Sequence, residues 1–311
     1  MRALGLLEAD QDIAELQLQL LGDSVLGFYD EETERMVVVT DEGLDALARI
    51  TYAHEYTHAL QDAAFDLGSL DTDAEGQDDQ SLARIAMVEG DATFSMLAWA
   101  VTNLTPDELF EIQNQELPDT TGIPSWLVEQ TTVFPYNEGL AWAGSQVGDP
   151  FAPNFAPVDA AYDAPPDSTE QIVHAEKWEP RETPTSIEIV DLAAALGDGW
   201  TEVDDTPLGE AFVRMMLEFH GIQRDVALAA TEGWGGDRVV VATGPDGAFA
   251  VAWRLAWDAR ADADEFVAAY NTAIRGLGFP ASVTELADGQ VLVAHGSSQE
   301  ILRRTVDAAD G

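Results

Sequence analysis

The chain has 311 residues, 46% of them apolar, so it can bury a substantial core. Asp and Glu number 58 against 14 Lys and Arg, which gives a formal net charge of -44. This balance argues against nucleic acid and anionic membrane surfaces as partners, because both are bound by clustered basic side chains. The chain has no cysteine, which excludes disulfides and thiolate metal sites.

The acidic residues are dispersed along the whole chain, and Lys177 is its only lysine. An acidic tail, a surface for a basic partner and adaptation to high salt are three explanations of this charge. Dispersion argues against a tail, and the near-absence of lysine beside a normal apolar content favours the third explanation. At molar salt the Debye length is roughly 3 Å, so self-repulsion is largely screened. We therefore expect a halophilic protein that loses structure in dilute buffer, which circular dichroism would test.

The first predicted elements are a helix and a hairpin. Residues 11–22 have apolar positions at helical spacing. The apolar runs SVLGFYD and RMVVVT are separated by the polar segment EETE, which predicts two antiparallel strands joined by a turn. After them, a helix that Thr40 or Asp41 would cap is predicted from one stripe of residues at spacings of three and four: Leu44, Leu47, Thr51, His54, His58, Asp62 and Phe65.

Helices and long connecting segments fill the middle of the chain. A second long helix is predicted over residues 81–100, after the acidic loop SLDTDAEGQDDQ. The segments TPDELFEIQNQE and FPYNEGLAWAGSQV are also typical of helices, and Pro-rich stretches such as VGDPFAPNFAPVDAAYDAPPDS connect them. The length of these stretches predicts functional loops.

The last hundred residues have a different character. GDRVVVATGPDGAFAVAWRLAWD predicts two strands joined at GPDG, and a helix follows over residues 262–275. SVTELADGQVLVAHG predicts a second hairpin, and a final helix begins at Ser297. This order of two strands, a helix, two strands and a helix predicts a small antiparallel sheet with helices packed on it.

The motif that carries chemistry is ITYAHEYTHALQD, residues 50–62. Residues four apart lie on one face of a helix, so His54 and His58 can direct their imidazole nitrogens to one zinc ion at about 2.0–2.1 Å. Glu55 projects about 100° away, where it can reach a water molecule near the ion. The spacing therefore predicts two zinc ligands and a separate general base.

A catalytic zinc site needs a third protein ligand, and Glu89 is the candidate. It falls on the apolar stripe of the next helix, in SLARIAMVEGDATFSM, where a carboxylate is costly unless a cation compensates it. Gly90 would allow two helices to approach closely, and Asp91 and Asp62 are candidates to orient the ligands. The alternative is two core histidines beside a buried, protonated Glu89.

These residues carry a resemblance. HEYTH followed by a helix bearing VEGDA resembles the gluzincin branch of the zincin metallopeptidases. GFYD, HEYTHALQD, VEGDAT, FPY, PPDSTEQIVHAEKW and GWGGDR together resemble a group of uncharacterised prokaryotic HExxH proteins, over roughly residues 3–270. The gap from His58 to Glu89 is longer than in the best-known gluzincins. The resemblance implies a zincin fold and bound zinc, and brings no substrate.

The expected fold class is α+β, in two parts. Residues 1–205 would form a zincin-like metal-binding catalytic domain of a hairpin, an HExxH helix and a Glu-bearing helix. Residues 206–311 would form a C-terminal subdomain of helices and antiparallel strands. No motif in the second part indicates a function.

Other parts of the site are predicted less directly. The strand Arg35–Val39 is expected to bind substrate backbone in extended form, as strand edges do in zincins. His174 and Tyr136 are candidates to stabilise an oxyanion. For His174 the alternative is a surface histidine paired with Glu170, and for Tyr136 it is a core aromatic residue with its hydroxyl at the rim.

The sequence thus predicts a zinc-dependent hydrolase, and specifically a metallopeptidase acting on a peptide or protein substrate with Glu55 as general base. The alternatives are a zinc amidase or deacylase, and a catalytically inactive zincin-fold binding protein. No stretch is long and apolar enough to span a membrane, and no signal peptide is recognisable. We expect a cytoplasmic location, or a secreted or surface-anchored one if the N-terminus is incomplete; the oligomeric state is not predicted.

Overall fold

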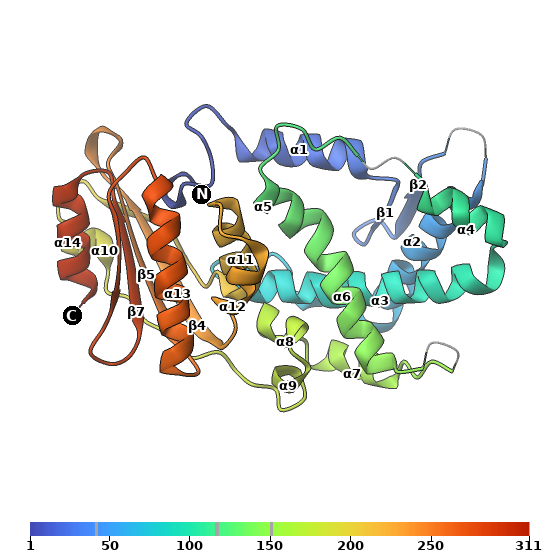
Figure 1. The fold of residues 1–311 in the computed structure, drawn as a ribbon. Coiled ribbons are helices and arrows are strands. Elements are labelled where there is room, and N and C mark those ends of the chain that lie inside the picture. The colour runs from blue at the N-terminus through green and yellow to red at the C-terminus, as the bar shows by residue number, and fades with distance from the viewer. Residues whose placement is uncertain (41–42, 116–117, 150–151, 311) are drawn as a thin grey trace.

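The structure is a computed structural model that describes residues 1–40, 43–115, 118–149 and 152–310. It is an α+β fold with a helical part that carries a two-stranded hairpin and a part built on a five-stranded antiparallel sheet (Figure 1). This confirms the expected α+β class, and the zincin-like arrangement of the first part stays a prediction. Within the described residues, no helix combines the length and apolar character needed to cross a membrane.

The N-terminal helix and hairpin form where the sequence predicts them. Helix α1 (Ile13–Ser24) begins at Asp12, whose carboxylate accepts hydrogen bonds from two backbone N–H groups of the first turn. Strands β1 (Gly27–Asp30) and β2 (Arg35–Val38) pair antiparallel, with Gly27 opposite Val38. The polar segment between them makes the turn.

Helix α2 (Ala46–Phe65) carries the HExxH motif and begins later than predicted. Its cap is Asp45, whose carboxylate accepts a hydrogen bond from the Ala48 backbone N–H at 2.8 Å. Thr40 is therefore not the cap, since its hydroxyl donates to the Gly43 carbonyl instead. Asp41, the other candidate, lies outside the described residues.

Helix α3 (Asp78–Asn103) packs against α2 and is crossed by α6 (Phe134–Val147). The crossing is closest at Gly90 and Gly139, where a Cβ on either residue would overlap backbone atoms of the facing helix. The predicted close helix approach at Gly90 is confirmed, with α6 as the partner. Without side chains at these positions the backbones can pack directly against each other.

The remaining elements of the helical part are short. A π-helical turn (Glu129–Val133) joins α5 to α6, so Tyr136 lies just after an irregular turn. The predicted helices at TPDELFEIQNQE and FPYNEGLAWAGSQV are confirmed. The other helices here are α4 (Pro106–Gln113), α5 (Ser125–Val128), α7 (Ala156–Asp163), α8 (Thr169–Val173), α9 (Ala175–Trp178) and the 3₁₀ turns Arg2–Leu4 and Leu67–Leu70.

The five-stranded sheet has the order β3-β4-β5-β7-β6, and all neighbours are antiparallel. The predicted order of two strands, a helix, two strands and a helix is confirmed. The strands are β3 (Thr201–Thr206), β4 (Trp234–Thr243), β5 (Phe249–Trp257), β6 (Ala281–Glu285) and β7 (Val291–Gly296), and the helices around them are α10 (Leu192–Leu196), α11 (Gly209–Phe219), α12 (Arg224–Ala229), α13 (Arg260–Ala273) and α14 (Gln299–Ala309).

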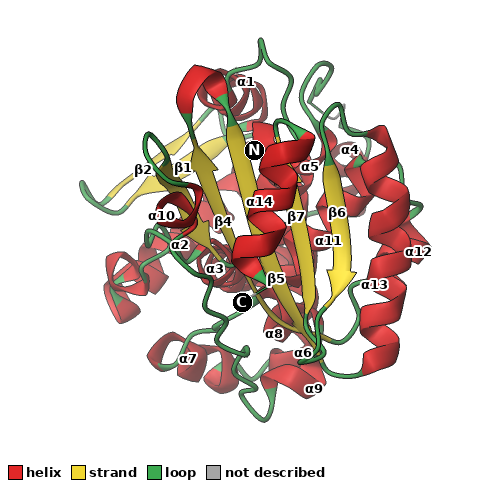
Figure 2. Ribbon diagram, turned by 90° about the vertical axis from the view of Figure 1, so that its left-hand side faces the viewer, coloured by secondary structure: helices red, strands yellow, loops and turns green. Residues whose placement is uncertain are grey.

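Both faces of this sheet are covered (Figure 2). Alternate residues of a strand point to opposite faces. Val240 and Ala242 accordingly pack with α10 and α14, whereas Val239 and Val241 join the main core with α11 and α13. Residues 239–242 of β4 are therefore buried on both sides of the sheet, and all four are apolar.

The main core runs through both parts of the chain. Helix α11 packs against α3, α5 and α8, and the ring of Phe212 meets that of Trp126 edge to face at 5.7 Å. Strand β3, at residues 201–206, also belongs to the sheet although all of it but Thr206 lies before the expected boundary. The division into two domains at residue 205 stays a prediction.

Candidate metal centre

The structure brings together the three predicted ligands. His54 and His58 lie on successive turns of α2, and their Nε2 atoms are 3.0 Å apart. Oε2 of Glu89, on α3, is 3.1 Å from Nε2 of His54 and 3.5 Å from Nε2 of His58. The glutamate that interrupts the apolar stripe of α3 thus faces the two histidines of the neighbouring helix.

The separations of these three atoms fit a common zinc ion. Ligands that lie about 2.0–2.1 Å from a tetrahedral ion are roughly 3.3 Å from one another. The three observed separations, 3.0, 3.1 and 3.5 Å, bracket this value. Two imidazoles and a carboxylate are also a common donor set for catalytic zinc. We conclude that the residues present fit the metal that the sequence predicts.

Gln61 fixes the orientation of His58. Its amide nitrogen donates to the Val88 carbonyl at 3.1 Å and to Asp91 Oδ2 at 2.8 Å, so its amide oxygen faces Nδ1 of His58, 2.8 Å away. Nδ1 therefore carries the hydrogen, and the lone pair of Nε2 points to the cluster. Tyr162 donates a second hydrogen bond to Asp91, at 3.0 Å.

This chain of hydrogen bonds, from Asp91 through Gln61 to His58, differs from the predicted arrangement. Asp91 acts on His58 through Gln61, which the sequence analysis missed although it lies one turn after His58 on the same helix. Asp62, the other predicted partner, instead accepts a hydrogen bond from the Tyr29 hydroxyl at 2.7 Å. Asp62 thereby ties α2 to β1.

Glu55 lies beside the cluster and is only 6% exposed. Burial raises the pKa of its carboxyl group, against the opposing effect of the nearby histidines. Gly27 of β1 makes room for it, because a Cβ there would lie 2.7 Å from Thr51 Cγ2 and 3.2 Å from Glu55 Cγ. For Glu89, burial is outweighed by hydrogen bonds from His54 and His58, which lower the pKa to about 2.

A cavity of about 330 Å³ opens over the cluster, and Glu55 and the three candidate ligands line it. The strand at this cavity is β1, whose residues 27–29 line it, and not the predicted Arg35–Val39. The reason is the close approach of Gly27 to Glu55, which sets β1 against α2. Among the described residues β1 pairs only with β2, so its other edge is free of strand partners.

Tyr136 lies in the same cavity. Its ring stacks against that of His54, with centroids 5.9 Å apart, and the residue is 36% exposed. Burial and the carboxylates of Glu89 and Glu55 raise the pKa of its hydroxyl. The phenol consequently keeps its proton and can donate a hydrogen bond into the cavity.

The structure does not bring His174 to this cavity. It follows α8, which Ser168 caps, and its Nε2 lies 2.9 Å from Oε1 of Glu210 on α11. It lines a separate cavity of about 270 Å³. The predicted role of His174 as oxyanion stabiliser is therefore wrong, because α8 faces α11 and not α2. Its expected partner Glu170 binds Lys177 instead.

A second group of carboxylates close enough to share a cation is Glu170, Glu182 and Asp258. The ammonium group of Lys177 lies among them, at 3.3, 2.6 and 2.5 Å. The only lysine of the chain thus supplies the positive charge that a metal would supply. This group is an ion-pair cluster that links α8 and α9 to the end of β5.

Comparison with known families finds similarity over residues 196–307, which match a domain of unknown function (DUF8575). The matched segment runs from the end of α10 to α14 and includes the five-stranded sheet. No curated protein and no solved structure matches the chain. The candidate metal centre lies outside the matched residues.

Proposed function

We propose that the protein is a zinc-dependent hydrolase with a zincin-like centre, and specifically a metallopeptidase. The observation that carries this is the meeting of three donor atoms, from His54, His58 and Glu89, 3.0–3.5 Å apart in a cavity that Glu55 also lines. When bound, zinc supplies Lewis-acid polarisation of a carbonyl group and acidifies water.

The chain's own residues supply the proton transfers. Glu55, within reach of the cluster and with a pKa raised by burial, takes a proton from the attacking water and passes it to the leaving nitrogen. Tyr136, protonated and open to the cavity, donates a hydrogen bond to the oxyanion that develops on the substrate. Both residues line the same cavity.

The edge of β1 that has no strand partner among the described residues favours a peptide over a small amide. An extended substrate can add to an unpaired strand through backbone hydrogen bonds, which bind any sequence in a defined direction. Residues 27–29 of β1 line the cavity beside Glu55, so the added strand would pass over the cluster. A zinc amidase or deacylase, the main alternative, would make no use of this edge.

Metal analysis combined with digestion of a peptide library in molar KCl tests the proposal. Zinc should copurify at about one ion per chain, and the library should be cleaved. Glu55→Gln should keep the zinc and lose turnover by at least about a hundredfold, the usual scale of general acid–base catalysis. Glu111→Gln, on the exposed surface of α4, is the matched control and should retain turnover.

Two outcomes would contradict the proposal. Peptide hydrolysis by Glu55→Gln at the wild-type rate would remove the assigned base. A zinc-loaded wild-type protein that cleaves no peptide would favour the inactive binding protein or, if it hydrolyses acylated amines, the deacylase.

A further inference from the structure

The cavity over the metal cluster has a wall without charge. Among the described residues that line it, Glu31 is the only charged one apart from Glu55 and the three candidate ligands. The apolar residues that line it are Val25, Phe28, Leu67, Leu70, Ile85 and Val88. Acidic residues are dispersed along the rest of this chain, so an apolar wall beside the candidate metal centre is a distinct feature of the site.

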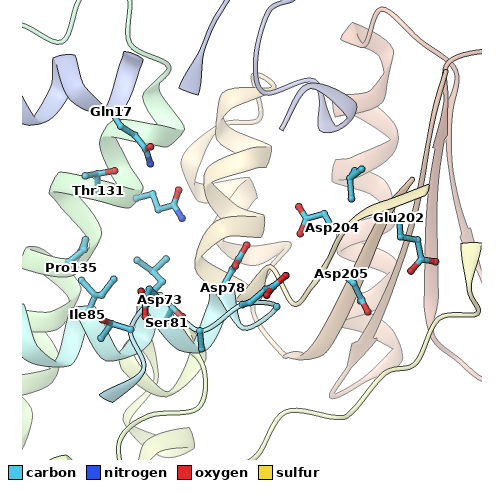
Figure 3. Close-up of a pocket in the computed structure, with 17 residues that line it drawn as sticks. Gln17, Asp73, Asp78, Ser81, Ile85, Thr131, Pro135, Glu202, Asp204 and Asp205 are labelled. Carbon is cyan, nitrogen blue, oxygen red and sulfur yellow. The ribbon is translucent and has the colours of Figure 1, made fainter. Parts of the chain in front are cut away.

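Ile85 brings apolar surface close to the ligands. It lies four residues before Glu89 on α3, so the two side chains share one face of the helix, about 6 Å apart along its axis. Ile85 is only partly buried. Figure 3 shows it on α3 near Pro135, with which it lines a larger, adjoining cavity of about 760 Å³. This apolar side chain therefore faces space that a ligand can enter.

The 3₁₀ turn Leu67–Leu70 forms a second part of the apolar wall, and hydrogen bonds hold it at both ends. The backbone N–H of Leu67 donates to Asp62 Oδ1 at 3.2 Å, and Arg84 Nη1 donates to the Leu70 carbonyl at 2.6 Å. The turn is thereby tied to both α2 and α3. Leu70 belongs to the main core, whereas Leu67 is only partly buried. A wall fixed in this way can bind a side chain without the entropic cost of ordering a loop.

Asp62 also ties this turn to β1. Its second carboxylate oxygen accepts the hydrogen bond of the Tyr29 hydroxyl at 2.7 Å, so one side chain holds both the strand and the turn, and both line the cavity. A peptide that adds to β1 directs alternate side chains to opposite faces. Every second side chain of such a peptide can therefore point into the space that Leu67 and Ile85 line.

The size and the surface of this space suit one apolar side chain. The whole cavity, of about 330 Å³, is at the lower end of the range of about 300–1,000 Å³ for small-molecule sites, so it holds a short part of a peptide. Covering partly exposed apolar side chains with an apolar group removes both surfaces from water, which is favourable. In molar salt, the condition expected for this acidic chain, attraction between exposed charges is screened beyond roughly 3 Å, whereas apolar contact persists.

We propose that Leu67 and Ile85 line an apolar subsite that binds an apolar side chain of the peptide substrate. Ile85 lies about 6 Å from Glu89 along α3, and an extended peptide advances about 3.3 Å per residue. The bound side chain therefore belongs to one of the two residues that come next to the cleaved bond on one side. The inference rests on the proposed peptidase function and assigns the substrate class: peptides with a side chain such as Leu, Ile, Met or Phe at this position.

Sequencing of the products from a random peptide library, digested in molar KCl, tests the proposal. Leu, Ile, Met and Phe should be enriched about tenfold or more over Gln at one position within two residues of the cleaved bond, the scale of a methylene group in an apolar pocket. Ile85→Phe fills the subsite and should shift the preference to Ala and Gly, whereas Ile85→Ala enlarges it and should shift the preference to Phe and Trp. Val101→Phe and Val101→Ala, at a 66% exposed position of the same helix outside the cavity, are the controls and should keep the wild-type preference.

A binding measurement separates this inference from the proposed function. Zinc-loaded Glu55→Gln is titrated with fluorescent peptides of Gly, Ser and Gln in which a single Leu replaces Gln at each position in turn, and anisotropy is recorded. Tighter binding of one Leu peptide, by about tenfold, would support the subsite even if the wild type cleaves nothing, provided that adding Ile85→Phe abolishes it and adding Val101→Phe does not. Equal binding of all the peptides, a preference for Lys or Arg at this position, or an apolar preference that the Ile85 variants leave unchanged would overturn the inference and leave the peptidase proposal standing.

Discussion

Gly90 and Gly139 face each other where α3 crosses α6, and the space between the two backbones leaves no room for a methyl group on either residue. The crossing sets the position of Tyr136, which lies one turn before Gly139 on α6 and stacks against His54. The contact between two glycines thus holds one wall of the cavity against the helix that carries Glu89.

Gly139→Ala is expected to destabilise the protein by about 1–3 kcal/mol or more, because the added carbon would overlap the Ala86 carbonyl and force the helices apart. Gly144→Ala, in the same helix, is the control: its Cβ would lie 3.8 Å from the Phe94 ring, an ordinary contact. The control should be neutral or stabilise by up to about 1 kcal/mol. Thermal unfolding in molar KCl measures both, and equal melting temperatures would contradict the prediction.

Gln61→Leu is expected to weaken zinc binding by about 10- to 100-fold, because His58 loses the acceptor that fixes its ring. Competition with a chelator measures the affinity, and the melting temperature of the zinc-loaded protein shows whether the fold is kept. Asp62→Asn, on the same helix but bound to Tyr29, should leave the affinity unchanged. A folded Gln61→Leu protein that binds zinc with wild-type affinity would show that Gln61 does not orient His58.

Lys177→Met is expected to lower the free energy of unfolding by about 1–3 kcal/mol, since it leaves the buried Glu170 without its cation. Burial, only partly offset by Lys177, raises the pKa of Glu170 to about 7. Adding Glu170→Gln should restore part of the loss. Denaturant unfolding of the two single variants and the double variant gives the coupling energy, and strictly additive effects would show that the pair does not interact.

His295 is expected to make stability fall in acid. Burial lowers its pKa to about 4, and its ring lies 2.8 Å from both the Ala3 carbonyl oxygen and the Tyr270 hydroxyl. In the unfolded chain this imidazole takes up a proton near pH 6.5, whereas the buried ring of the folded protein stays neutral until about pH 4. The contribution of the ring to stability is therefore complete only above about pH 6.5. This contribution is lost between about pH 6.5 and pH 4, at up to about 1.4 kcal/mol per pH unit.

Comparison of the wild type with His295→Gln isolates this effect. Asp79, whose pKa burial raises to about 7, and Glu170 act in the opposite direction, because the folded state takes up their protons first as the pH falls. Both carboxyl groups are present in the wild type and in His295→Gln, so their effect cancels in the comparison. Unfolding curves at pH 7 and pH 4.5 should therefore show a steeper loss for the wild type, and parallel losses would contradict the assignment.

The sequence predicts those features that depend on local spacing. The i, i+4 pair of His54 and His58, the position of Glu89 on an apolar stripe and the alternation of the C-terminal strands all follow from helix or strand periodicity. The start of α2 was missed because Thr40, Asp41 and Asp45 are all capable caps, and tertiary contacts choose among them. Gln61 carried a local signal, its position one turn after His58, that was overlooked.

Features that depend on contacts far apart in the sequence could not be predicted. Either strand of the hairpin satisfies the pattern for a cavity wall, and the packing of Gly27 on Glu55 selects β1. His174 has the composition of a catalytic residue, but Glu210, contributed by α11, holds it in another cavity.

Helix α11 lies in the segment that matches a known domain family, yet its residues from Gly209 to Leu217 are buried on every side. One side packs on β4, α12 and α13, and the other packs on α3, α5 and α8. A fragment cut at the start of the matched segment would expose the Phe212 face to water. The two parts should therefore melt in a single cooperative transition, and a relative that contains the matched domain without this helical part would need polar residues on that face of α11.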